Sequence, residues 1–195
     1  AALAASGARA QRPADPTEGV CPYAFERVAI LDAGYLLQWT LRDATLAVRI
    51  VTAGTGWAAI GWPSTSSTTG HTDFDVSFGA VIGGVPSIGD FYQDVFAPPV
   101  PDAQNDVTLL GGSEGAGTTL EFTRPFDTGD EAEDNVIVEG PLNLKWAYQP
   151  TSDDPTDNHV GFTRGRMVVE IVPPGHLFAD GFENESPCAW SLLVP

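Results

Sequence analysis

Three histidines are the side chains of this sequence that could bind a metal ion or transfer a proton near neutral pH. His71 follows a run of Ser, Thr and Gly, and His159 lies in "DNHVGFTRG", shortly before an apolar segment. His176 lies near the C-terminus and is assigned no role. A lone loop histidine is usually an ordinary surface residue, so spacing alone does not identify a site.

Familiar catalytic motifs are absent from the sequence. It contains no nucleophile elbow, CxxC, HExxH or phosphate-binding glycine loop. Acidic residues such as Asp153 and Asp154 lie in polar segments, where solvation is their ordinary role. For the same reason the acidic segment 127–135 is not expected to bind calcium. We therefore do not expect the protein to be an enzyme.

Two cysteines, Cys21 and Cys188, lie near opposite ends of the chain. A disulfide between them is the simplest interpretation in an exported protein, and closing so long a loop would stabilise the fold by about 5 kcal/mol in the chain-entropy model. Buried free thiols and pairing between subunits remain open. The opening "AALAASGARAQ", rich in small residues, resembles the start of a processed, exported protein.

Composition limits the possible partners. The chain has 195 residues, of which 43% are hydrophobic, and its 26 acidic and 9 basic residues give a net charge of −17. Nucleic acid and anionic membrane surfaces would be repelled. No apolar run is long enough to span a bilayer. One domain with a substantial core is expected.

The elements that must position these side chains are short strands. Apolar residues alternate in "YLLQWTLRD", where Leu37, Trp39 and Leu41 share one face, and the same period of two recurs in later segments. Segments such as "PPVPDAQND", "GGSEGAG" and "DTGDEAEDN" have turn composition. This pattern predicts an all-β antiparallel sandwich or barrel. The further alternating or apolar segments are 46–53, 56–62, 74–84, 118–126, 142–148 and 166–172.

The chain divides into three parts by composition. Residues 1–22 have no period and are expected to form an extended tail, held by the domain surface or by a neighbouring subunit. Residues 23–173 form the sandwich, and residues 174–195 form a C-terminal tail.

An ordered set of landmarks resembles the DOMON family. "GWAAIGW" is followed by an Asp that begins a strand, a "DFYQD" stretch, "DAQND", "FTRPFDTGD", "KWAY" and a His before Arg-Gly. The resemblance covers roughly residues 28–172. It implies an Ig-like β-sandwich of about 9–11 strands, in agreement with the strand pattern. The segment "DGFE…W" near the C-terminus resembles a terminal motif of exported bacterial proteins, which implies a secreted, extracellular or periplasmic location.

The resemblance also implies a cofactor. Some DOMON domains are b-type cytochromes of extracellular oxidoreductases, in which a Met and a His bind a haem iron between the sheets near one end. His159 matches the family His, and His71 occupies the Met position if Asp75 is the strand Asp. If Asp73 is that residue, Thr69 takes the position instead. No CxxCH occurs, so a covalently attached haem is excluded.

The expected haem site therefore contains two axial imidazoles, apolar walls and a cation. His71 and His159 are the expected iron ligands, and a propionate partner is expected at Arg164. Arg124 is expected to form a structural ion pair with an acidic loop, and Met167 is expected to lie in the core. The wall candidates are Trp57, Trp62, Phe78 and Trp146.

Three functions compete at this point. The first is electron transfer by haem b, with a redox partner protein or neighbouring copies of the chain as partner. The second is a non-haem DOMON module that binds a carbohydrate or another ligand. The third is a structural subunit of an extracellular assembly or filament, built through the N-terminal tail.

Overall fold

Two antiparallel β-sheets make up the described part of the protein. The structure, a computed structural model, describes residues 25, 27–63 and 74–172. Residues 1–22, Cys21, Cys188 and His71 lie outside this range, so the predictions made for them stay predictions. The described strands are β1 (Arg27–Asp32), β2 (Tyr35–Arg42), β3 (Thr45–Thr52), β4 (Ala58–Pro63), β5 (Phe74–Ile82), β6 (Val85–Gln93), β7 (Val100–Pro101), β8 (Thr108–Glu114), β9 (Thr118–Pro125), β10 (Gly140–Tyr148) and β11 (Arg164–Ile171).

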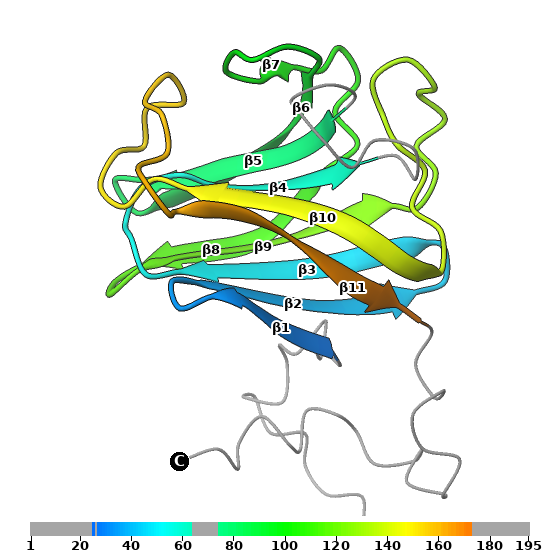
Figure 1. Cartoon of the computed structure of the whole chain (residues 1–195), viewed down its shortest axis with the longest axis horizontal. Helices are drawn as coiled ribbons and strands as arrows, with labels where there is room; N and C mark the ends of the chain where they lie inside the picture. Colours follow the sequence, from blue (N-terminus) through cyan, green and yellow to red (C-terminus); the bar gives the residue numbers. More distant parts are fainter. Residues whose placement is uncertain (1–24, 26, 64–73, 173–195) are drawn as a thin grey trace, which may run out of the picture.

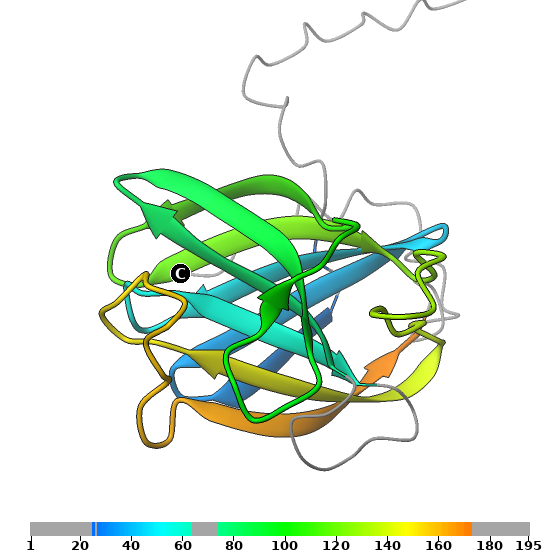
Figure 2. The ribbon, with the colours of Figure 1, turned by 90° about the horizontal axis from the view of Figure 1, so that it is seen from above.

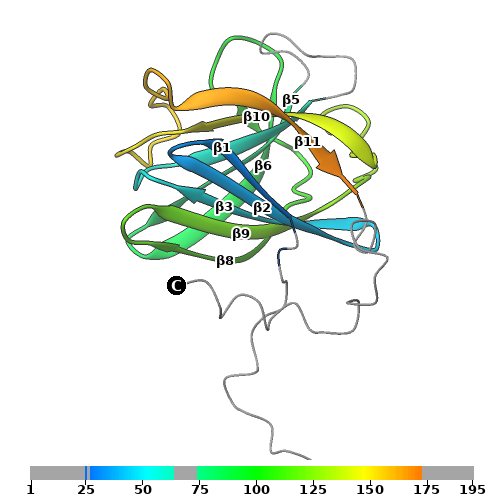
Figure 3. The ribbon, with the colours of Figure 1, turned by 60° about the horizontal axis from the view of Figure 1, so that its bottom comes forward.

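The sheets stack face to face as a sandwich (Figure 1). One sheet has five strands in the order β1-β2-β3-β9-β8, and the other has six in the order β11-β10-β4-β5-β6-β7. All the pairings are antiparallel. The predicted all-β antiparallel sandwich is confirmed. Edge strands β1 and β11 lie side by side where the two sheets meet (Figure 3).

The main core lies between the sheets and follows the predicted alternation. Leu37, Trp39 and Leu41 of β2 all point inward and are at most 5% exposed. On the facing sheet, Leu144 is fully buried and Trp62 is 1% exposed. Met167 packs against this core as expected. Period-two patterning thus placed the inner faces of the central strands correctly.

Tight turns fix the register of the hairpins. Gly83 and Gly84, with φ of 59° and 81°, form the two-residue connection between β5 and β6. A turn with positive φ at both central residues suits the twist of a hairpin and favours glycine. Asp43, with φ of 52°, occupies a similar position between β2 and β3.

Two expectations about strands were wrong. Residues 111–114 were expected to form a turn, yet they complete β8, where Gly112 allows Pro86 of β6 to approach closely. Strand β5 was expected to be buried on one face only, yet Phe74–Val81 are all buried. Strand β8 lies at a sheet edge, where glycine is tolerated even though a glycine-rich segment resembles a turn. Strand β5 is buried on both faces because other segments of the chain cover its outer face.

Within residues 25, 27–63 and 74–172, no helix has the length and apolar character needed to span a bilayer.

Candidate functional site

A second apolar cluster covers the outer face of the six-stranded sheet, on the side away from the main core. Its buried members come from β4, β5 and the residue before β4, and Phe91 and Ala147 pack against them. A cavity of about 980 Å³ opens above this cluster. The buried members are Trp57, Ala59, Phe74, Val76, Phe78 and Ala80. The site therefore has an apolar floor on the rigid centre of a sheet.

Small residues on the central strands make room for the cavity. Ala59 and Gly61 of β4 and Ala147 of β10 line it, so little side-chain volume rises from the middle of the floor. Around them stand larger rings. The ring centroids of Trp57 and Phe78 are 5.0 Å apart, which fixes both rings in a tilted contact.

Connecting segments form the walls. Residues 96–99 after β6 line one side, and Asp157, Asn158 and His159 of the β10–β11 loop line another. Trp57 holds this loop, because its indole Nε1 donates a hydrogen bond to the Asp157 carbonyl oxygen at 3.1 Å. Figure 2 looks onto this face, with the β10–β11 loop at its margin.

Two connections leave the six-stranded sheet at opposite ends of β4. At one end Ala58 pairs with Tyr148, from which the His159 loop leaves β10. At the other end Pro63 pairs with Phe74, and residues 64–73 connect these two positions. The two predicted histidine ligands thus belong to segments that join the sheet at opposite ends of this strand.

His159 lines the cavity beside a cation. Its Nε2 lies 3.1 Å from Nη1 of Arg164. A guanidinium can only donate, so a hydrogen bond between the two side chains requires Nε2 to be an unprotonated ring nitrogen. An unprotonated imidazole nitrogen is the form that binds metals.

One wall of the cavity is cationic, although the whole chain is strongly acidic. Lys145, Arg164 and Arg166 all line it. Lys145 Nζ lies 3.3 Å from the centroid of the Phe74 ring. Burial, followed by the nearby Arg166 charge, lowers the pKa of Lys145 to about 8. An anionic group on a ligand would therefore be favoured at this wall.

Most of the predicted site residues meet at this cavity. Trp57, Phe78, Trp146, His159 and Arg164 line it. The cavity lies outside the sandwich core, and not between the sheets as the resemblance implied.

Two other candidates lie elsewhere. Trp62 points into the core between the sheets, where its Nε1 donates to Ser77 Oγ at 3.0 Å. Arg124 forms the expected structural ion pair, but its main partner is Asp75 of β5, with Asp134 of the acidic loop 4.0 Å away.

Sequence reasoning missed several lining residues. Phe74 and Val76 share a strand face with Phe78, so alternation alone could have added them to the site. Lys145 and Arg166 carried no signal, because they appear as ordinary exposed strand positions. Phe96 lies just before the segment of turn composition at 98–106, where no pattern indicated a site.

Comparison with known proteins agrees with the fold and places it in a family. Two relatives are 30% identical, the DBH-like monooxygenase protein 1 of Gallus gallus over 77% of this chain and that of Homo sapiens over 58%. The matches cover only 24% and 18% of those proteins.

Two solved structures share the fold. The cytochrome b domain of pyranose dehydrogenase from Coprinopsis cinerea superposes with a TM-score of 0.54 at 15% identity, over 70% of this chain and 76% of that domain. The cytochrome domain of Myriococcum thermophilum cellobiose dehydrogenase gives 0.51 at 12% identity, over 71% and 75%. Residues 31–149 match the DOMON domain profile, and the chain therefore belongs to the DOMON family.

Proposed function

We propose that this protein binds haem b in the outer-face cavity and transfers electrons outside the cytoplasm, with His71 and His159 as axial ligands. The observation that carries the proposal is the cavity itself, which has an apolar floor on β4 and β5 and His159 in its wall. The two solved structures described above are both named as cytochrome domains. The proposal does not extend the monooxygenase name of the larger relatives to this chain.

The size and lining of the cavity fit a large, flat, mostly apolar cofactor. A volume of about 980 Å³ lies at the upper end of the range of about 300–1,000 Å³ that is usual for ligand sites. Trp57 and Phe78 supply aromatic walls. Trp146 borders the cavity from β10, but its ring packs in the core between the sheets, with its centroid 5.3 Å from that of Tyr35.

Two axial ligands must approach a flat ring from opposite faces. His159 stands on the loop at one end of β4, and His71 is three residues before Phe74 at the other. Three residues of chain span at most about 11 Å, so the backbone of His71 lies no farther than that from a residue of the cavity floor. This geometry supports His71, but does not by itself distinguish it from Thr69.

The remaining polar residues have defined roles in this proposal. Arg164, Arg166 and Lys145 would pair with the carboxylates of the cofactor, and Arg164 would release His159 Nε2 to the iron. Haem would supply a reversible one-electron change at its iron. With both axial positions occupied by imidazole, the domain would bind no substrate at the metal and would act as a module without turnover.

In this proposal the electron partner, another protein or a neighbouring copy, approaches at the mouth of the cavity. Phe96 lies there with 84% of its surface exposed. A contact at this position would bring the partner close to the cofactor.

A second function is favoured by one observation. Apolar rings beside three cations would also suit a non-haem ligand with an apolar body and an acidic group. This alternative keeps the cavity and its cationic wall, but needs neither histidine.

The visible spectrum separates these functions. The purified protein, as isolated and after titration with haemin, should show a sharp Soret band and split α and β bands when reduced with dithionite. His159→Ala and His71→Ala should each replace the six-coordinate spectrum with a five-coordinate or weakly bound form. His176→Ala is the matched control and should leave the spectrum unchanged.

A protein that is colourless and does not bind haemin would overturn the haem proposal. If His71→Ala keeps the six-coordinate spectrum and Thr69→Ala loses it, then Asp75 is not the strand Asp of the family pattern and His71 does not occupy the family Met position. Haemin binding that is unchanged in both His71→Ala and His159→Ala would favour the non-haem ligand function.

A further inference from the structure

A buried group of carboxylates lies between the sheets, behind the floor of the cavity. Asp75 of β5 is fully buried, Asp90 of β6 is 3% exposed, and the side chain of Asp134, in the β9–β10 loop, is 2% exposed. One oxygen from each of the three lies within 4.8 Å of the others. Arg124 of β9 is the cation beside them.

In Asp75 and in Asp90, only one of the two carboxylate oxygens accepts a hydrogen bond. Asp75 Oδ2 accepts from Arg124 and from the Asn135 N–H, the latter at 3.2 Å. Asp90 Oδ2 accepts from the Asp106 N–H at 3.1 Å. Asp75 Oδ1, Asp90 Oδ1 and both oxygens of Asp134 are buried and have no hydrogen-bond partner among the described residues. The three carboxylates come from three separate segments of the chain.

Charge in this group does not balance. Three carboxylates face one guanidinium, which leaves two negative charges if all the groups are ionised. Burial raises the pKa of Asp75 to about 8 and that of Asp90 to about 7, with neighbouring carboxylates adding to the shift. Unpaired buried charge is costly, so a missing positive charge is the simplest explanation for such an arrangement.

We propose that Asp75, Asp90 and Asp134 bind one divalent cation of the calcium type. The donors are all oxygen, which suits a hard cation and not zinc. Calcium–oxygen bonds of about 2.3–2.6 Å allow ligand oxygens to lie up to about 4.6–5.2 Å apart, and the oxygens here all lie within 4.8 Å of one another. A divalent ion also neutralises the two excess charges, and water would complete the coordination shell.

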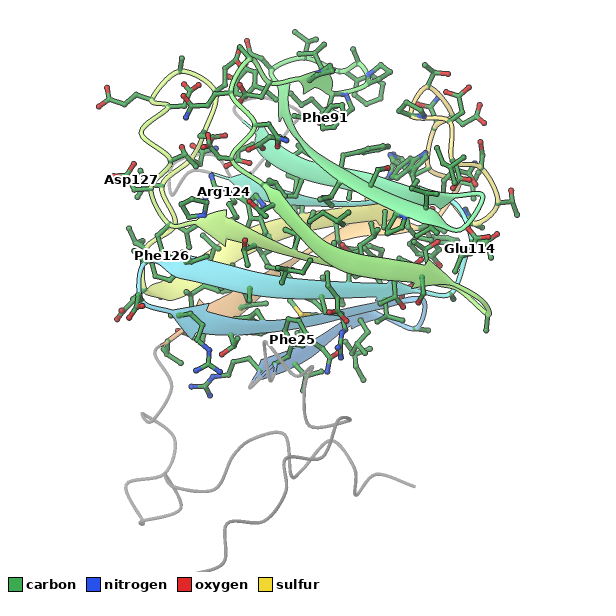
Figure 4. All side chains as sticks on the ribbon, turned by 180° about the vertical axis from the view of Figure 1, so that it is seen from behind. Phe25, Phe91, Glu114, Arg124, Phe126 and Asp127 are labelled. Carbon is green, nitrogen blue, oxygen red and sulfur yellow. The ribbon has the colours of Figure 1, made fainter. Side chains whose placement is uncertain are left out.

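The bound ion would fasten the β9–β10 loop to the six-stranded sheet. Figure 4 shows Arg124 at the base of this loop, which begins with Phe126 and Asp127. Asp134 brings the loop to the ion, while Asp75 and Asp90 belong to paired strands β5 and β6. This inference is independent of the haem proposal, because the side chain of Asp75 points to the opposite face from Phe74.

A second acidic group lies close by in the same segments and provides a control. Asp102, Asp130 and Glu133 are half-buried, and the pKa of Glu133 is raised by hydrogen bonding to Asp102. Half-buried acidic residues are common without a metal, so no site is assigned there.

Calcium chloride added to the full-length protein, after treatment with EGTA, tests the inference. Calorimetric titration should show one saturable site, with calcium binding more tightly than magnesium. Thermal unfolding at pH 7.5 should shift upward by about 5–10 °C when calcium exceeds the dissociation constant by 100-fold. Neither measurement requires haem, so failure here leaves the haem proposal intact.

Asp134→Asn is the most direct variant, since the Asp134 carboxylate is the group by which the β9–β10 loop would reach the ion. It should weaken calcium binding at least about tenfold and reduce the thermal shift accordingly. Asp130→Asn, in the neighbouring group, should leave both unchanged. The proposal is overturned if the native protein shows no saturable calcium binding, or if Asp130→Asn, and not Asp134→Asn, removes it.

Discussion

Strand β5 separates two environments that differ in almost every physical respect. On its outer face, Phe74, Val76 and Phe78 form the floor of an open, apolar cavity. On its inner face, Asp75 lies in a closed interior among other carboxylates and Arg124. The two faces alternate residue by residue along the same nine-residue strand.

This difference shows how one strand can serve two sites. The outer face borders the cavity, so its buried side chains pack against neighbours on the sheet and against the cavity walls. The inner face is packed on all sides, and its charges are satisfied only in combination. Substitutions inside should therefore cost folding stability, while substitutions outside should mainly change what the cavity binds.

The largest effect is expected from Arg124→Met. Removing the guanidinium that contacts the buried carboxylates leaves Asp75 without its ion pair, which should lower the free energy of unfolding by about 3–5 kcal/mol. Urea denaturation at pH 7.5 measures this value. Adding Asp75→Asn to Arg124→Met should restore part of the loss. If Arg124→Met lowers the free energy of unfolding by less than about 1 kcal/mol, the inner face of β5 is not more sensitive to substitution than the outer face.

A matched pair of phenylalanines compares the two faces directly. Phe122→Ala, in the closed core, should lower the free energy of unfolding by about 3–5 kcal/mol, because it creates a cavity. Phe78→Ala should cost about 1.5–3 kcal/mol, since its ring borders space that already exists. Urea unfolding of the ligand-free variants checks the order. Equal losses would show that the outer face is packed as tightly as the core.

Acidity should act on the inner face in a defined direction. The raised pKa values of Asp75 and Asp90, about 8 and about 7, mean that the folded protein holds more protons than the unfolded chain above about pH 4. Stability in EGTA should therefore fall as pH rises from about 4 to about 8. The charged neighbours of the pair are Arg124, Asp134, Asp102 and Asp106.

Thermal unfolding between pH 5 and pH 8, with and without calcium, gives the comparison. Calcium requires deprotonated carboxylates, so a saturating concentration should flatten or reverse the slope. A calcium-free protein that becomes more stable across this range would contradict the charge imbalance described above.

The smallest effect concerns the cationic wall. Lys145→Met should weaken binding of haemin by about 1.5–5-fold, as expected for a partly exposed ion pair. In the native protein the contribution of Lys145 should decline as pH rises through its lowered pKa of about 8, because the ammonium loses its charge. Spectrophotometric titrations at pH 7 and pH 9 measure both effects. The same pH dependence in Lys145→Met would assign it to another group.

The sequence was informative wherever strand geometry alone decides the outcome. The alternation in Leu37, Trp39 and Leu41 predicted an inner face correctly. Trp57 and Trp62 were both named as wall candidates, yet they lie five positions apart, and an odd spacing on an extended chain places residues on opposite faces, so only Trp57 reaches the cavity.

Other features depend on contacts that no local pattern carries. Asp134 meets Asp75 and Asp90 across long stretches of sequence, because the β9–β10 loop closes over the end of β5 and β6. The loop composition of 127–135 indicated only solvation, and burial of one of its carboxylates follows from the tertiary fold. Burial of β5 on both faces likewise depends on segments that come later in the chain.

The position of the cavity also has an evolutionary consequence. Its floor is part of the scaffold, but its walls come from chain segments attached at strand ends, such as 94–99 and 149–163. Insertions or exchanges in these segments leave the inner hydrogen-bonded pairs and the core untouched. Lineages of this domain can therefore exchange one bound molecule for another while the sandwich itself drifts slowly, and a designer could graft new specificity by the same route.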